Sequence, residues 1–178
     1  LIPVEYPFER GWDWISLYAV GSSGTLDLKT PTGWVAPMQD GENGVNEIRS
    51  QHELLYRDPE FGFFGDIEQL RPEDGMYKIH SLYDDNVASQ MVFKAGYDNL
   101  TRASSLRLPQ VRPGYTWITY PHELDHQLST LAPYLSRSAD AGDMIIGRDA
   151  FAFYDGEEWL APEGFMFQAG KGYMYFNL

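Results

Sequence analysis

Residues 11–16 read GWDWIS, and residues 114–119 read GYTWIT, 103 positions further along the chain. In both stretches the aromatic residues occupy alternate positions, which is the period of a β-strand whose two faces differ. A second pair of similar stretches follows: residues 46–50 (NEIRS) match residues 143–147 (DMIIG), 97 positions apart. The same order of matching stretches indicates an internal duplication.

The second offset also aligns the ends of the two copies. Leu70 aligns with Phe167, and residues 75–77 (GMY) align with residues 172–174 (GYM) without a gap. The difference between the two offsets falls in one connection, directly after the opening strand, where loops vary in length. We expect a scaffold of matching strands, with individual features in this connection.

The duplication predicts a division of the chain into three parts. We expect a first repeat unit in residues 1–80, a linker in residues 81–112 and a second repeat unit in residues 113–178. Within the linker, residues 90–93 (QMVF) predict a strand.

Short apolar runs bounded by Asp and Gly predict a mainly β fold. Strands are expected at residues 151–154, 159–160 and 173–176, each introduced by turn-forming residues. One helix is expected in residues 123–135, where leucines recur at spacings of four, three and four. Pro133 should limit this helix to about two turns. The predicted fold class is therefore β-rich, with one or two short helices and two tandem copies of a small β unit.

These motifs resemble a tandem repeat of secreted and cell-surface proteins of Bacteroidota. Its copies open on a GWNWIS-like strand, as residues 11–16 and 114–119 do here, and continue through a DxIKSQ-like strand, which residues 46–51 and 143–148 resemble. They close on PGKGY, to which residues 169–175 (AGKGYMY) are similar. The first copy departs from this ending, because it reads RPEDG at the corresponding place.

The resemblance implies a fold and a setting, but no catalytic residues. It implies an accessory region of an exported, multidomain protein, located outside the cell or on its outer-membrane surface. Since the first residue is Leu1 rather than Met, we expect the chain to be part of a larger, processed protein. Its partners would then be protein or glycan ligands at the cell surface.

The composition narrows the classes of partner. The 178 residues include 26 acidic and 13 basic side chains, giving a net charge of −13, which repels nucleic acid and anionic lipid headgroups. No apolar run approaches the roughly 20 residues that cross a bilayer, so direct membrane insertion is not expected. The chain has no cysteine, and no cofactor is expected.

Aromatic residues make up 15% of the chain and are candidates for ligand contacts. An exposed ring can stack on the apolar face of a sugar, and Trp34, in the variable connection, is the best placed of the candidates. The other candidates are Trp159, Tyr154 and Tyr115. The matching tryptophans of the opening strands, in contrast, are expected to pack in the core or between the repeats: Trp12, Trp14 and Trp117.

Residues 122–126 read HELDH and match the H-E-x-x-H motif of zinc peptidases. In that motif two histidines on one helix face bind Zn²⁺, here His122 and His126, while the glutamate, here Glu123, acts as the general base. Against this interpretation, no third histidine follows at the usual spacing, and Pro121 places His122 at the first turn of any helix. The first copy also has no equivalent pair.

Three hypotheses follow from the sequence. The leading one is a non-catalytic accessory module that serves as a spacer, in adhesion or in ligand binding, without metal or cofactor. The first alternative is a carbohydrate-binding module of a glycan-degrading system, with ligand contacts from Trp34, Tyr154 and Trp159. The second is a small zinc metallopeptidase that uses His122, Glu123 and His126.

Overall fold

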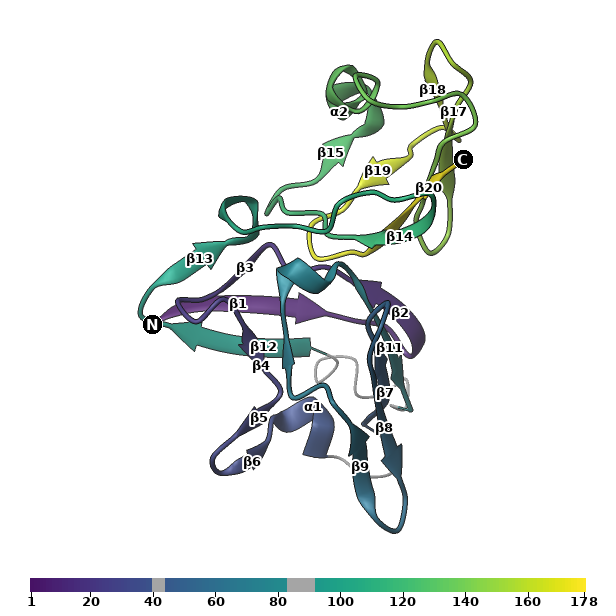
Figure 1. The fold of residues 1–178 in the computed structure, drawn as a ribbon. Helices are drawn as coiled ribbons and strands as arrows, with labels where there is room; N and C mark the ends of the chain where they lie inside the picture. Colours follow the sequence, from purple (N-terminus) through teal and green to yellow (C-terminus); the bar gives the residue numbers. More distant parts are fainter. Residues whose placement is uncertain (40–43, 83–91) are drawn as a thin grey trace.

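The computed structural model describes residues 1–39, 44–82 and 92–178, which form two units stacked along the chain (Figure 1). Unit 1 comprises the described residues up to 106, and unit 2 comprises residues 113–178. Each unit contains a five-stranded antiparallel sheet, and the two sheets have the same strand order. The repeated topology confirms the mainly β fold built from two tandem copies.

The two sheets correspond strand by strand. In unit 1 the order is β2 (Gly11–Ile15), β11 (Tyr77–Ser81), β7 (Val45–Arg49), β8 (Leu54–Asp58) and β9 (Gly62–Gly65). In unit 2 it is β14 (Gly114–Ile118), β20 (Tyr173–Asn177), β16 (Met144–Ile146), β17 (Phe151–Tyr154) and β18 (Trp159–Leu160). The opening strands β2 and β14 lie at one edge of each sheet.

Short elements cover one side of each sheet. In unit 1 they are the pairs β4 (Leu26–Asp27) with β10 (Gln69–Leu70) and β5 (Lys29–Thr30) with β6 (Gly33–Trp34), together with α1 (Ala36–Gln39) and the 3₁₀ turn η1 (Pro72–Asp74). In unit 2 they are the pair β15 (His126–Gln127) with β19 (Met166–Phe167), and α2 (Leu128–Leu135). In Figure 1, α1 and α2 both lie to the left of the two sheets.

Unit 1 also has an antiparallel ribbon that unit 2 lacks in its described residues. The ribbon pairs β1 (Ile2–Pro7) with β12 (Val92–Tyr97), and next to it β3 (Ala19–Gly21) pairs with β13 (Leu100–Arg102), which leads into η3 (Ala103–Ser105). Both β12 and β13 come from the segment expected to be a linker, so this segment packs onto unit 1. Of the strand expected at residues 90–93, positions 90 and 91 lie outside the described residues.

The hydrogen-bond register corrects one part of the sequence alignment. Tyr77 lies opposite Ile15 in unit 1, and Tyr173 lies opposite Ile118 in unit 2. Tyr173 is therefore the counterpart of Tyr77, at an offset of 96 rather than 97. Met76 is the additional residue of the first copy, and it is fully buried.

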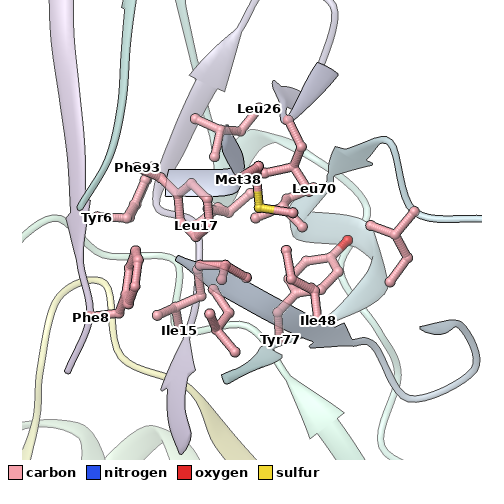
Figure 2. Packing of buried hydrophobic residues seen from close by; sticks show 14 of the residues in the cluster. Tyr6, Phe8, Ile15, Leu17, Leu26, Met38, Ile48, Leu70, Tyr77 and Phe93 are labelled. Carbon is pink, nitrogen blue, oxygen red and sulfur yellow. The ribbon is translucent and has the colours of Figure 1, made fainter. Parts of the chain in front are cut away.

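Each unit has a separate hydrophobic core. The core of unit 1 is the larger, and most of its members are fully buried; Figure 2 shows Tyr6 and Phe93 of the ribbon, and Phe8 directly after β1, near Ile15 and Leu17. The core of unit 2 is smaller, and its aromatic residues remain slightly accessible to water. Deep burial of apolar side chains is the main source of stability, so unit 1 should be the more stable of the two.

The predicted helix in residues 123–135 is shorter in the structure. Helix α2 begins at Leu128, because residues 126 and 127 pair with β19 as a strand. Leu124, the first residue of the predicted leucine stripe, is therefore outside the helix and is 68% exposed. Pro133 lies inside α2, which ends about half a turn later at Leu135.

The two units contact each other through matching segments. The backbone N of Gly172 donates to the carbonyl of Trp14 at 2.9 Å, and the N of Ser16 donates to Gly170 at 2.9 Å. On the other side of the contact, Gly75 takes the corresponding position against the carbonyl of Trp117, where an added Cβ would lie only 2.1 Å from the oxygen. The edge strand of each unit is thus held by the closing segment of the other.

Matching side chains strengthen this reciprocal contact. Gln51 donates to the carbonyl of Tyr115 and accepts from the N of Trp117, both at 2.9 Å. Arg148 is aligned with Gln51, and it likewise reaches the edge strand of the other unit, where its guanidinium pairs with Asp13 at 3.3 Å. The contact is an approximate two-fold arrangement of the two copies, as in a symmetric dimer.

Candidate functional site

The five-stranded sheet of unit 2 presents an outer face, the face directed away from its core, made only of apolar and aromatic side chains. Two rows of cross-strand neighbours form this outer face. The first row consists of Tyr115, Phe176, Met144, Phe153 and Leu160. The second row consists of Trp117, Met174, Ile146 and Phe151. Each of these nine side chains is exposed or half-buried.

The outer face of unit 1 has the same layout but a mixed composition. Its rows consist of Trp12, His80, Glu47, Tyr56 and Phe64, and of Trp14, Lys78, Arg49 and Leu54. Exposed aromatic rings therefore stand beside side chains that donate and accept hydrogen bonds. The guanidinium of Arg49 lies 5.5 Å from the ring centroid of Trp12, and the ring of His80 lies 4.9 Å from the same Trp12 ring.

The exposure of the unit 2 outer face is high for aromatic residues. Tyr115 is 57% exposed, Phe151 51% and Phe153 37%. The strands of this sheet are apolar at consecutive positions, a pattern typical of sheets that are covered on both faces. A contiguous apolar surface of this kind marks a site of interaction on a soluble protein.

The two outer faces join at the contact between the units. The Nζ of Lys78 lies 4.7 Å from the ring centroid of Trp14 and 4.8 Å from that of Trp117. Burial lowers the pKa of Lys78 from its ordinary value, and the neighbouring Arg49 lowers it further. The shared cation holds both rings in place, since each ring face attracts positive charge. In Figure 1 the two sheets lie one above the other on the right of the view.

These positions correct the expectation that the matching tryptophans lie in the core. Trp12 is 41% exposed, and Trp14 and Trp117 are half-buried on the outer faces. The inner face of β2 carries Asp13 and Ile15 instead, at 2% and 0% exposure. Packing between the units, the other expected role, is what Trp14 and Trp117 provide.

Three of the four aromatic candidates for ligand contacts are shielded. Tyr154 and Trp159 are each 7% exposed in the core of unit 2, where their rings lie 5.3 Å apart. Trp34 is half-buried against Phe63, at 4.5 Å between ring centroids. Only Tyr115 is open to solvent, and it belongs to the outer face of unit 2.

The zinc-peptidase motif does not have the expected helical geometry. Residues 122–125 precede α2, so His122 and His126 do not share a helix face. Their rings are nevertheless adjacent, with 5.1 Å between centroids, and both rings contact the ring of Tyr120. The hydroxyl of Tyr120 donates to the carbonyl of Leu124, and the Nδ1 of His126 is hydrogen-bonded to the same hydroxyl oxygen.

The carboxylates of the motif are engaged elsewhere. Glu123 pairs with Arg102 of unit 1 at 2.6 Å, and Asp125 accepts a hydrogen bond from the N of Ala169 at 2.8 Å. Among the described residues, no group of three or more His, Asp or Glu side chains is placed to hold a metal ion. Within residues 1–39, 44–82 and 92–178, a third zinc ligand is therefore not placed beside the histidine pair.

A charged cavity of about 280 Å³ lies between the units, but its charges neutralise one another. Asp13 is bound there by Lys171 at 2.9 Å and by Arg148. Arg148 also pairs with Glu9 and Asp149, and these carboxylates raise its pKa, with Asp149 the largest contributor. This network joins the units and does not form an open site for an ion.

The structure also bears on membrane contact and on relatives. In the described part of the chain, no helix is both long and apolar enough to span a bilayer. Comparison with known protein families, with curated proteins and with solved structures found no match. The function must therefore be inferred from the geometry of the two sheets.

Proposed function

We propose that this chain is a non-catalytic binding module of a larger exported protein, and that it binds a neutral polysaccharide through the outer faces of its two sheets. The observation that carries the proposal is the unit 2 outer face, where nine neighbouring positions are all apolar or aromatic and accessible. The export of the parent protein is supported by the resemblance to surface repeats.

The chemistry of the outer faces favours a sugar over a charged ligand. The face of a pyranose ring that carries axial C–H groups is apolar, and it stacks on aromatic rings such as Tyr115 and Phe176, which lie 4.8 Å apart. In unit 1, Trp12 stands beside Glu47, Arg49 and His80, which supply donors and acceptors for hydroxyl groups.

The net charge narrows the class of polysaccharide that the module can bind. At −13 the module repels acidic polysaccharides, while neutral chains carry no such penalty. An open sheet face also matches an extended polymer better than a compact small molecule, which binds in concave sites.

Affinity electrophoresis tests the proposal. The protein is run through native gels with and without a soluble neutral glucan, and parallel gels contain polygalacturonate as the acidic comparison. We expect the neutral glucan alone to retard the protein. The double variant Tyr115→Ala/Phe153→Ala should bind about tenfold or more weakly, because two stacking contacts are lost.

A matched control separates the outer face from exposed apolar residues in general. Phe61 and Leu124 are 75% and 68% exposed but lie outside both outer faces. The double variant Phe61→Ala/Leu124→Ala should bind as the unmodified chain does. Equal retardation of the two double variants, or no retardation by neutral glucan, would exclude polysaccharide binding through this surface.

A further inference from the structure

Unit 2 contains an apolar cavity of about 560 Å³ on the inner side of its sheet, beneath α2. This volume lies within the usual range for small-molecule sites. The sheet side of the cavity is lined by Ile118, Tyr120, Ile145, Phe167, Tyr173 and Tyr175. It is separate from the outer faces, which lie on the opposite side of the same sheet.

The same positions in unit 1 are sealed. The counterparts of the six lining residues are all 0% exposed: Ile15, Leu17, Ile48, Leu70, Tyr77 and Ile79. The ribbon of β1 and β12 supplies the rings of Tyr6 and Phe93 to the same core, and Phe8 follows directly after β1; Figure 2 shows these rings near Ile15 and Leu17. Aromatic rings are therefore among the groups that pack against this sheet surface in unit 1.

Unit 2 lacks the segment that would supply such rings. At the offset of the opening strands, the counterpart of Phe8 is Val111, which is 42% exposed, and the counterpart of Tyr6 is Pro109. Residues 107–113 form no strand. Ile118, the counterpart of the fully buried Ile15, consequently remains half-buried.

Polar groups stand at the mouth of this cavity. The rings of His122 and His126 lie 5.1 Å apart there, and the ring nitrogens of His122 have no hydrogen-bond partner among the described residues. Desolvation lowers the pKa of His122, and the neighbouring His126 lowers it further. A neutral imidazole both donates and accepts, which suits a hydroxyl group better than a carboxylate.

We propose that the cavity of unit 2 binds a small uncharged aromatic molecule that carries a hydroxyl group. The ring occupies the place that Tyr6, Phe8 and Phe93 fill in unit 1, against Ile118 and Ile145. The hydroxyl group is bound by His122 at the mouth. The histidine pair thus has a role in binding that requires neither a metal nor a helix.

Two probes of the same size test both parts of the proposal: 2-naphthol, and naphthalene, which lacks the hydroxyl group. Binding is followed by the methyl signals of the protein in NMR spectra and by titration calorimetry. We expect 2-naphthol to shift the signals of Ile118, Ile145 and Leu131, and to leave those of Ile15 and Ile48 unchanged.

Substitutions at the cavity separate ring binding from hydroxyl binding. Thr130 lines the cavity from an exposed position, so Thr130→Trp should fill the mouth without disturbing the core, and Leu131→Trp should fill the interior. Each should weaken the binding of both probes about tenfold or more. His122→Ala should weaken 2-naphthol severalfold and leave naphthalene unchanged. The control is Phe61→Trp, in unit 1 and outside both outer faces, which should bind both probes normally.

Several results would overturn the inference. Shifts confined to other parts of the chain, or unchanged binding in Thr130→Trp, would show that the cavity is not the site. If the cavity instead receives a ribbon from a second copy, the protein would dimerise with rising concentration in sedimentation experiments, and Thr130→Trp would abolish the dimer. A failure of the cavity to bind the probes would leave the proposal of polysaccharide binding standing, because the outer-face variants and the cavity variants change opposite sides of the sheet.

Discussion

Asp13 joins the two units, and its removal is the most direct test of their coupling. This carboxylate belongs to unit 1 and is 2% exposed, while its partners Lys171 and Arg148 belong to unit 2. It also accepts backbone hydrogen bonds from Glu9 at 2.9 Å and from Trp14 at 2.8 Å. The variant Asp13→Ala therefore leaves two cations and two backbone donors without this acceptor.

The expected loss follows from the burial of the partners. Removing one member of a buried ion pair costs about 3–5 kcal/mol when the other stays buried and unpaired. The side chains of Lys171 and Arg148 are each 29% exposed, so water offsets part of this cost. We expect Asp13→Ala to lower the free energy of unfolding by about 3 kcal/mol, a large fraction of the stability of an ordinary domain.

Glu9 provides the matched control. It pairs with the same Arg148 at 2.6 Å, but its side chain is 65% exposed. Exposed pairs contribute about 0–1 kcal/mol, so Glu9→Ala should be nearly neutral. Urea unfolding, followed by circular dichroism and by tryptophan fluorescence, measures both variants. A loss for Asp13→Ala that is no larger than the loss for Glu9→Ala would refute the structural role of the buried carboxylate.

Three further predictions concern the contact between the units and the core of unit 2. Gly75→Ala should lower the free energy of unfolding by about 3 kcal/mol or more, because φ is +88° and the new Cβ would lie 2.1 Å from the carbonyl oxygen of Trp117. Gly62→Ala, with φ of +86° but open space around it, measures the backbone strain alone. Equal urea midpoints for the two variants would contradict the clash. Lys78→Ala should lower the free energy of unfolding by about 1 kcal/mol and change the tryptophan fluorescence emission, since the rings of Trp14 and Trp117 lose their shared cation. Unchanged emission would argue against that contact. Burial raises the pKa of Tyr120 to about 12. As the pH rises, the unfolded chain therefore loses the phenolic proton before the folded chain does, and the free energy of unfolding should fall between pH 10 and pH 12. An unchanged free energy of unfolding over that range would show that the phenol is not shielded.

Much of the fold could be predicted from short patterns in the sequence. The alternation in residues 11–16 and 114–119 predicted β2 and β14, and the aromatic runs predicted β17 and β20. Local alternation is enough for this, because side chains on neighbouring positions of a strand point to opposite faces. The duplication followed from the same stretches, and the common strand order of the two sheets confirms it.

The candidate site could be predicted only in part, because the sequence does not say which face of a strand is covered. Trp12 and Trp14 are more hydrophobic than Asp13, and local sequence therefore placed them inside. The signal for the outer face of unit 2 was present in β17, where Phe151 and Phe153 alternate with Ala152 and Tyr154, which are uncharged as well. A strand that is apolar on both faces indicates two covered surfaces, but not which of them is the core.

By itself, the sequence determined the strands, their alternation and their repetition, since these depend on interactions between near neighbours. The tertiary structure decided which side of each strand is buried. Asp13 can lie inside because unit 2 brings Lys171 and Arg148 to it. Likewise, His122 and His126 meet against the ring of Tyr120, which stacks on the distant Phe167, and not on one face of a helix. These outcomes depend on contacts between residues far apart in the chain, whose geometry no local pattern contains.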